Sequence, residues 1–302
     1  MKRAAPASKW KPFLGSAKPT AITEKAGFLS LALSSLVVVL VLFWIMGDIF
    51  INGASVINWA FLSQSPREGM TQGGIFPAII GTLLVSLITI LMAVPLGMFS
   101  AIYLNEYAYQ GKLVRLIRLS IRNLSGVPSI VYGLFGVALF VRFLHFGAGI
   151  LSAGMTLGLL TLPWTITASE EALKTVPKSF RDGALALGAT KWQAIRTNVL
   201  PYAIPGMLTG AILGLARAAG ETAPILFTGA AFFLPFLPRS LFDQFMALPY
   251  HLYILATQHQ DIARVRPIAY GTALVLIALI LCLNGIAIVI RYRYRKRARM
   301  NQ

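Results

Sequence analysis

Two oppositely charged residues, Arg217 and Glu221, stand inside an apolar segment in the C-terminal half of the chain. Because they are four residues apart, they share one face of a helix, where the guanidinium and the carboxylate can pair. A charge at the centre of a lipid bilayer costs about 2.5–3.5 kcal/mol on insertion scales, so such charges usually face protein or water and mark function. A guanidinium also binds oxyanions through paired hydrogen bonds. The pair is therefore a candidate anion site, and the alternative is an ion pair that only fastens two helices.

Small residues precede this pair on the same side of the expected helix. Gly210, Gly214, Arg217 and Glu221 are spaced by four, three and four residues, which places them on one stripe. Small residues on a membrane helix let a second helix approach closely. We therefore expect the stripe to face another helix rather than lipid.

The composition of the chain requires a membrane around these residues. Of its 302 residues 57% are apolar and only 12% are charged, and the mean hydropathy is +0.71. Soluble domains carry about 25% charged residues. Several charge-free runs reach the length of about 20 residues that a membrane-spanning helix needs, and backbone groups in lipid must be satisfied within the segment, as a helix does. The sequence therefore predicts an all-α, polytopic membrane protein.

Six membrane spans are expected. Pro95 should bend the second, and the run Ser125–Ser129 should bend the chain at the entry to the third. The expected spans cover residues 27–51, 74–103, 123–143, 147–169, 204–227 and 267–290.

The distribution of positive charge fixes the expected orientation. Most of the 27 Lys and Arg residues fall in the two tails and in two internal loops, 112–122 and 170–201. This is the positive-inside pattern of membrane proteins, and it predicts that both termini are cytoplasmic. Because the net charge of +17 gathers beside the spans, nucleic-acid binding is not expected, whereas contact with anionic lipids is. We therefore expect a basic cytoplasmic tail at 1–26, a transmembrane domain at 27–292 and a second basic tail at 293–302. A retained first span is favoured over a cleaved signal peptide.

The loop at 170–201 is polar and basic, yet it carries two short amphipathic patterns. Pro177 suits the first turn of one helix, Gly188 suits a helix end with positive φ, and Thr190 can cap the next helix. Two such helices joined at a glycine can insert into a groove of a partner protein. The alternative is a helical hairpin that lies in the lipid headgroup layer. The apolar residues of the two helices are Phe180, Ala184, Leu185 and Leu187, and then Trp192, Ile195 and Val199.

This loop resembles the EAA loop of bacterial ABC-importer permeases, whose pattern is E-A-A, three residues, G, nine residues and I-x-L-P. The chain departs from the pattern in having Asp182 for Glu, Gly183 for Ala and Asn198 for Ile. The resemblance implies a type I ABC-importer permease fold and two short cytoplasmic helices that dock a separate ATP-hydrolysing subunit. The residues that it assigns to docking are Asp182, Gly183, Ala184, Gly188, Leu200 and Pro201.

A second resemblance concerns the charged pair. The run Arg217–Pro224, R-A-A-G-E-T-A-P, is similar to the R-A-x-G-E-T-A-P segment of phosphate-specific ABC-importer permeases, and Ala247–Tyr253 resembles the A-type subunit of that system. The likeness extends over about 74–290. It implies that Arg217, Glu221 and Thr222 act in passage of the anion. Glu221 would hold Arg217 in place or accept the proton of hydrogen phosphate, which sulfate lacks.

The same resemblance implies the partners and the location. These are a homologous second permease, two copies of a cytoplasmic ATP-binding subunit, a periplasmic phosphate-binding protein and the lipids of the bacterial inner membrane. The chain itself would hold no cofactor, because ATP binds to the partner, and it would not be an enzyme.

Other functions are weighed against this interpretation. The sequence has no G-x-x-x-x-G-K-[ST] loop and no metal or nucleophile set of the kind that an intramembrane enzyme needs. An ABC permease for sulfate, molybdate or phosphonate would keep the same fold and loop, so only the Arg217–Pro224 segment speaks against it. A secondary transporter driven by an ion gradient often shows inverted repeats and broken helices, which the sequence does not reveal.

Overall fold

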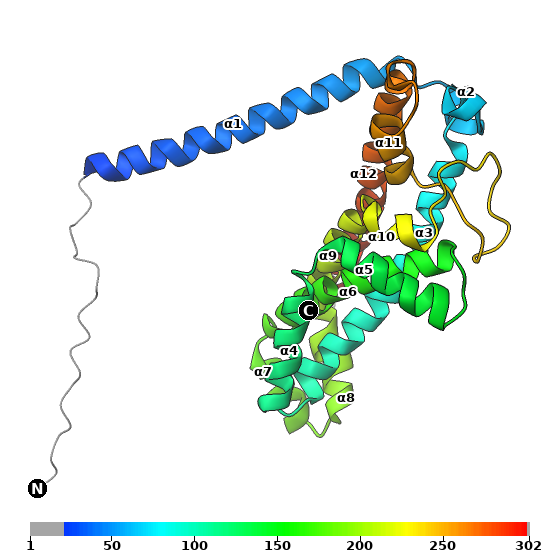
Figure 1. The fold of residues 1–302 in the computed structure, drawn as a ribbon. Coiled ribbons are helices and arrows are strands. Elements are labelled where there is room, and N and C mark those ends of the chain that lie inside the picture. Colours follow the sequence, from blue (N-terminus) through cyan, green and yellow to red (C-terminus); the bar gives the residue numbers. More distant parts are fainter. Residues whose placement is uncertain (1–20, 301–302) are drawn as a thin grey trace, which may run out of the picture. The chain divides into compact units, whose positions relative to one another are not determined.

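The computed structural model describes residues 21–300, and the chain divides into two compact units, 1–48 and 49–302. Most of the expected N-terminal tail therefore lies outside the described residues. The first unit contains the greater part of helix α1, Ala21–Ala54 (Figure 1). The Leu and Val side chains of α1 are exposed all around the helix, which suits lipid rather than water. The expected first span at 27–51 is confirmed.

Within the described residues, five helices are long and apolar enough to cross a membrane, or six if one bent pair counts as a span. Besides α1, four of them match expected spans, and Pro95 lies inside the first of these four. The last continues as a helix to Met300, so the expected C-terminal tail prolongs this helix. The four are α3 (Phe76–Ile102), α6 (Ile150–Lys174), α9 (Leu200–Ala219) and α12 (Ile262–Met300).

The third expected span is the bent pair. Helix α4, Lys112–Leu124, and the helical stretch 129–143, which begins with α5 (Ser129–Gly136), meet at an angle of 103°. Pro128 explains the bend, because its ring and its missing N–H prevent the helix from continuing. The expected bend at 125–129 is confirmed. The expected span at 123–143 is wrong at its start, because α4 is an amphipathic basic helix and the apolar helix begins only at Ser129.

The fifth expected span, 204–227, is also broken. Helix α9 ends at Ala219, and a separate short helix, α10 (Ala223–Thr228), follows. Pro224 stands at the start of α10 and cannot donate a hydrogen bond to the preceding turn, which favours a new helix start there over continuation of α9. The break comprises residues 220–222, between Arg217 and Pro224.

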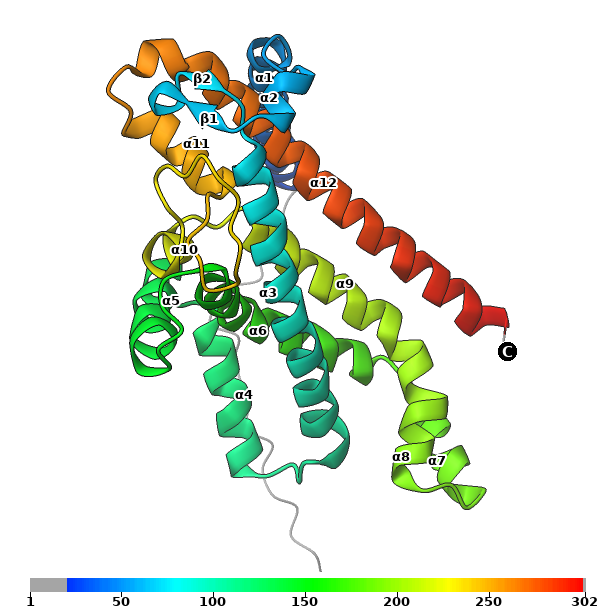
Figure 2. The same cartoon turned by 90° about the vertical axis from the view of Figure 1, so that its right-hand side faces the viewer.

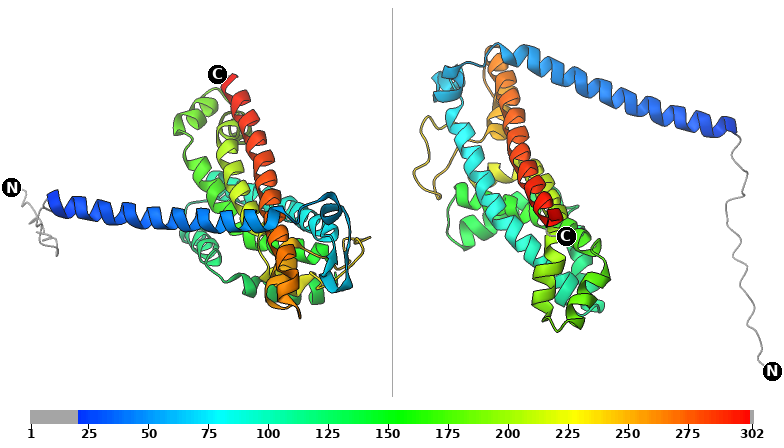
Figure 3. Two further views of the ribbon diagram at one scale, coloured as in Figure 1. Left: turned by 90° about the horizontal axis from the view of Figure 1, so that it is seen from above. Right: turned by 180° about the vertical axis from the view of Figure 1, so that it is seen from behind.

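The end of the second unit at which α3 begins carries short elements. Helix α2, Trp59–Ser63, leads into a two-stranded antiparallel ribbon of β1, Pro66–Arg67, and β2, Gln72–Gly73, which the sequence did not predict. Helix α11, Leu248–Thr257, lies beside α12, which also packs against α9 (Figure 3). Except for this ribbon the described chain is all-α.

The core lies where α6 packs between α3 and α9 (Figure 2). Glycines on the two flanking helices allow this close approach. A methyl group at Gly97 of α3 would lie 2.6 Å from Thr165 Cγ2, and one at Gly206 of α9 would lie 2.8 Å from Ala172 Cβ. Gly210 of α9 faces Ala168 in the same way. The expectation that the glycine stripe faces another helix is confirmed.

A larger side chain at a glycine between α6 and α9 should destabilise the fold. Gly210→Val would place branched carbons into the Ala168 methyl, and overpacking of this kind costs about 1–3 kcal/mol of unfolding free energy. Gly214→Ala is the matched control, because the nearest atom to its new methyl is Thr165 Oγ1 at 3.7 Å, an ordinary contact. Thermal unfolding of the purified chain in detergent should show a lower midpoint for Gly210→Val only. Equal midpoints for the two variants would contradict this packing.

Candidate functional site

The break between α9 and α10 positions the charged pair. Arg217 stands in the last turn of α9, and Glu221 follows the helix end at Gly220. The Gly220 N–H donates to the Arg217 carbonyl at 3.2 Å and the Glu221 N–H donates to the Ala218 carbonyl at 3.1 Å, so two tight turns close the helix. In Figure 2 this break lies between the end of the unit that carries α7 and α8 and the end that carries α11. The pair therefore sits at a helix terminus rather than within a continuous span.

The guanidinium of Arg217 has two neighbours that hold it in place. Its Nε lies 3.5 Å from Glu221 Oε1, and its central carbon lies 5.2 Å from the ring centre of Trp164 on α6. The Arg217 side chain is 46% exposed, whereas that of Glu221 is 18% exposed. The distance between the two charged groups is long for an ion pair. The guanidinium can therefore bind a further anion without first breaking a short hydrogen bond.

Stability alone does not account for this pair. Ion pairs with an exposed member contribute at most about 1 kcal/mol, and that gain is small beside the cost of placing charges in a membrane protein. Thr222, the third expected residue, stands half-buried just before α10, and its side chain does not cap that helix. The structure thus brings all three residues to one helix break.

The expected docking loop forms two helices joined at a glycine. Helix α7 covers Lys178–Ala186, and Gly188 has a φ of +80°, as expected from the sequence. Thr190 caps α8, Lys191–Ala194, and shares a capping box with Gln193, whose bonds measure 3.3 Å and 2.8 Å. We call residues 178–199 the hairpin.

The second arm of the hairpin is not a separate helix. Through a π turn, Ile195–Val199, α8 passes directly into α9, so that residues 191–219 form one helical run. Pro201 lies in the first turn of α9, directly after the π turn. Pro177 precedes α7 instead of standing in its first turn.

The expected docking residues divide into two groups. Asp182, Gly183 and Gly188 are exposed on the hairpin, whereas Ala184 is buried beneath them. Leu200 and Pro201 are half-buried at the start of α9, where Leu200 packs against the core.

The apolar side expected for α7 is correct only in part. Phe180 packs against the core and its ring meets that of Tyr202 at 4.7 Å, but Leu185 is 47% exposed and Leu187 is 91% exposed. Trp192 on α8 is 47% exposed as well. These three exposed apolar side chains give the hairpin a surface that a partner protein can cover.

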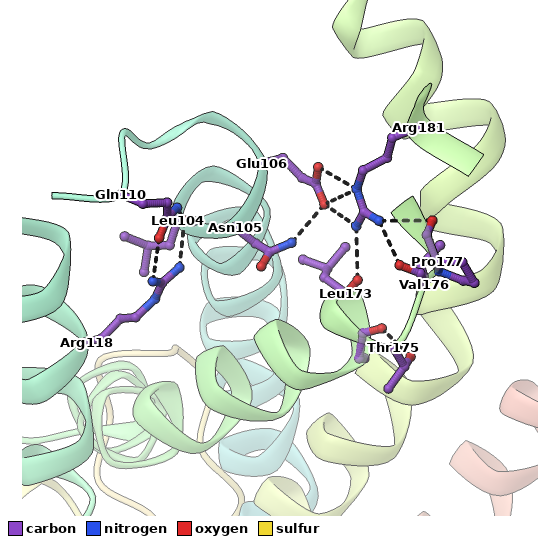
Figure 4. A network of polar contacts seen from close by, with 11 residues as sticks. Leu104, Asn105, Glu106, Gln110, Arg118, Leu173, Thr175, Val176, Pro177 and Arg181 are labelled. Atoms are coloured by element: carbon purple, nitrogen blue, oxygen red, sulfur yellow. Dashed lines mark hydrogen bonds and ion pairs between the residues drawn. The ribbon is translucent and has the colours of Figure 1, made fainter. Parts of the chain in front are cut away.

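Two buried ion pairs near the hairpin escaped the sequence analysis. Arg181 of α7 pairs with Glu106 at the end of α3, and Arg118 of α4 pairs with Glu170 of α6. Figure 4 shows the two arginines and several of their partners. The sequence held one signal: acidic residues are rare in this chain, and an acid at a span end needs a partner when it is buried. Within residues 21–300, no group of three or more His, Cys, Asp or Glu side chains could hold a metal ion.

Comparisons with known proteins agree with this arrangement. The family described as "Binding-protein-dependent transport system inner membrane component" matches residues 93–299. A probable ABC transporter permease protein, YqgI of Bacillus subtilis, is 32% identical over 87% of this chain and 93% of its own length. The phosphate transport system permease protein PstA 1 of Mycobacterium tuberculosis is 34% identical over 88% and 87%, and PstA of Yersinia pestis is 37% identical over 66% and 69%.

Solved structures share the fold at low sequence identity. A chain of a bacterial alginate ABC transporter superposes with a TM-score of 0.68 at 15% identity, covering 91% of this chain and 97% of that one. A chain of the MetNI methionine ABC transporter gives 0.55 at 18% identity, covering 73% and 94%. The expected type I importer fold is thereby confirmed. From the family match and its relatives, this multi-pass chain belongs to the inner-membrane components of binding-protein-dependent transport systems.

Proposed function

We propose that this chain is the permease subunit of an ABC importer that carries inorganic phosphate across the bacterial inner membrane. One observation carries the proposal: a half-exposed guanidinium stands at a helix break beside a carboxylate, within a chain 34% identical to a phosphate permease. Phosphate is favoured over sulfate, molybdate or phosphonate because relatives named for phosphate transport cover most of this chain. An ion-driven secondary transporter is not favoured, because the family depends on binding proteins.

The helix break supports a role in passage. Backbone that leaves a helix within a membrane protein is tolerated where it is buried in protein or lines a water-filled cavity. The break at 220–222 ends α9 one turn after Arg217, so an anion there would meet the guanidinium at a helix end. Trp164 would keep the guanidinium from turning away, because a cation over an aromatic face is attracted to it.

Glu221 has two roles in this proposal. It steadies Arg217, and its carboxylate can accept a hydrogen bond from the P–OH group of hydrogen phosphate, which is a charge-assisted bond. A sulfate ion carries no such proton, so the carboxylate would only repel it. A site built to hydrogen-bond an O–H group of its substrate rejects an analogue that lacks this group, because the polar group of the site is then left unpaired.

The partners follow from the family. The exposed face of the hairpin would dock a cytoplasmic ATP-binding subunit, with one further copy on a homologous second permease. A periplasmic phosphate-binding protein would meet the end that carries α11 and the β1–β2 ribbon. Both termini would then be cytoplasmic, together with the basic hairpin, and lipids would cover α1. ATP binds to the partner, so this chain would hold no cofactor and catalyse no hydrolysis itself.

Reconstitution tests the proposal directly. The chain is co-purified with its membrane partners, placed in liposomes and supplied with candidate binding proteins and ATP. We expect phosphate with its binding protein to stimulate both ATP hydrolysis and uptake, and sulfate to stimulate neither. Stimulation by another oxyanion, or uptake by the purified chain without ATP, would contradict the proposal.

A further inference from the structure

The side chain of Arg181 joins the hairpin to the end of helix α3. Its Nε donates to both carboxylate oxygens of Glu106, at 3.2 Å and 3.0 Å, and its Nη2 lies 2.6 Å from Glu106 Oε1 (Figure 4). Glu106 belongs to a π turn, Tyr103–Tyr107, that prolongs α3. Asn105 donates a further bond of 2.8 Å to the same carboxylate. The first arm of the hairpin is thus held to α3 by a forked, charge-assisted contact.

The same guanidinium also holds the end of helix α6. Arg181 Nη2 donates to the Leu173 carbonyl at 3.0 Å, and Nη1 donates to the Val176 carbonyl at 2.8 Å. Leu173 lies in the last turn of α6 and Val176 lies just beyond its end, where a positive charge is favoured. One side chain therefore links three elements: α7, α3 and α6.

The second arm of the hairpin meets the same π turn. Lys191, the first residue of α8, places its Nζ 5.0 Å from the ring centre of Tyr107. Both arms therefore converge on the end of α3, one through Glu106 and the other through Tyr107.

Burial makes the Arg181–Glu106 contact stiff. The Arg181 side chain is 19% exposed and that of Glu106 is 6% exposed. A buried pair resists breaking, because separation leaves a charge without a partner in a low-dielectric surrounding. The docking face of the hairpin, in contrast, is open. A force applied at that face therefore reaches α3 and α6 through the Arg181–Glu106 contact, which we call the joint, and it reaches α9 through the continuous helical run 191–219.

We propose that Arg181 is a positioning residue that transmits movement of the hairpin to α3 and α6, with Glu106 as its partner. This inference rests on the proposed docking of an ATP-hydrolysing subunit on the hairpin. It differs from docking itself, because Arg181 and Glu106 lie behind the exposed face and need not touch the partner. Because α6 packs against both α3 and α9, a displacement of α3 and α6 is then transmitted to the helix break at Arg217.

Variants at the joint separate transmission from folding. Arg181→Gln and Glu106→Gln each leave one charge unpaired, and the double variant removes both charges. Because a lone buried charge is worse than none, the double variant should regain thermal stability. The double variant should not regain the transmission of hairpin movement to α3 and α6, because the forked contact is still missing. A merely structural role predicts recovery of both properties.

The matched control is the other buried pair. Arg118 Nε lies 2.9 Å from Glu170 Oε1, and the two side chains are 23% and 8% exposed. This pair joins α4 to α6, and Arg118 also donates to the Leu104 carbonyl of the π turn at 2.9 Å, but it does not contact the hairpin. Arg118→Gln therefore removes a buried ion pair beside the same π turn while it leaves the contacts between the hairpin and that turn intact.

The functional test uses the reconstituted complex. In Arg181→Gln we expect the ATP-binding subunit to co-purify normally and the ATP hydrolysed per phosphate imported to rise about ten-fold, a typical size for altered coupling between sites. Arg118→Gln should leave this ratio unchanged. Three results would overturn the proposal that Arg181 transmits movement. They are an unchanged ratio in Arg181→Gln, an equal rise in Arg118→Gln, and loss of the ATP-binding subunit from Arg181→Gln. Failure of the proposed function would appear earlier, as absent phosphate uptake by the unsubstituted chain.

A second measurement does not depend on transport. Spin labels are placed on α3 and α7, through Phe99→Cys and Leu185→Cys in the full chain with Cys282→Ser, in lipid nanodiscs. Both label sites are exposed, with Phe99 66% and Leu185 47% accessible. Electron paramagnetic resonance should give a narrow distance distribution that Arg181→Gln broadens and Arg118→Gln does not. An equally narrow distribution in Arg181→Gln would overturn the joint even if phosphate were not the substrate.

Discussion

Replacing Arg217 by glutamine should lower phosphate uptake by at least about 100-fold at limiting phosphate, because two hydrogen bonds to a charged group, each of about 1.5–3 kcal/mol, are lost. The helix break should persist, since Pro224 and not the ion pair ends α9. Co-purification of the ATP-binding subunit should therefore be normal. Uptake of labelled phosphate into proteoliposomes measures the effect.

Two controls sharpen this result. Arg217→Lys keeps the charge but lacks the fork, so uptake should fall to an intermediate level. Arg291→Gln removes an arginine that donates to Thr209 Oγ1 at 3.0 Å between α12 and α9, and it should leave uptake near normal. Undiminished uptake in Arg217→Gln would show that the pair merely fastens structure.

Replacing Gly188 by arginine should abolish transport while the chain still inserts into the membrane. With a φ of +80°, Gly188 has a conformation that costs other residues about 1 kcal/mol or more. The space around it is open, so the new side chain would project from the docking face instead of disturbing the core. Membrane fractionation, co-purification of the ATP-binding subunit and phosphate uptake measure the three properties separately.

Gly183→Ala provides the control for this substitution. Gly183 lies inside α7 with no atom within 4 Å of the added methyl, and alanine there favours the helix by about 0.5–1 kcal/mol. Although Gly183 is one of the docking residues, alanine is the residue that the EAA pattern has at this position, so transport should be unaffected. Wild-type uptake from Gly188→Arg would refute docking at the hairpin.

The sequence predicted the parts of this fold that depend on local chemistry. Apolar runs gave the spans, and Gly188 and Thr190 gave the turn and the cap of the hairpin, because positive φ and capping are decided by neighbouring residues. The expected fifth span runs across Gly220, because hydropathy does not detect a helix break. Pro224 is the local sign of that break.

The tertiary contacts could not be predicted in the same way. Glu106 and Arg181 are separated by 75 positions, and no pattern in either segment names the other. Trp164 lies against the guanidinium of Arg217, and no pattern around either residue indicates that contact. Such pairings depend on how α3, α6 and α9 pack, and this packing follows from glycines whose partners are known only in three dimensions.

The most direct test asks whether water and phosphate reach the break between α9 and α10. Gly220 is exposed, lies between Arg217 and Glu221 and has a φ of −97°, which a cysteine tolerates. Gly220→Cys with Cys282→Ser is assembled with its partners and treated with a membrane-impermeant thiol reagent. We expect modification that phosphate, together with its binding protein, slows and that sulfate does not. Two results would contradict an anion route past Arg217: a thiol that stays unmodified in the assembled importer, or a modification rate that phosphate does not change.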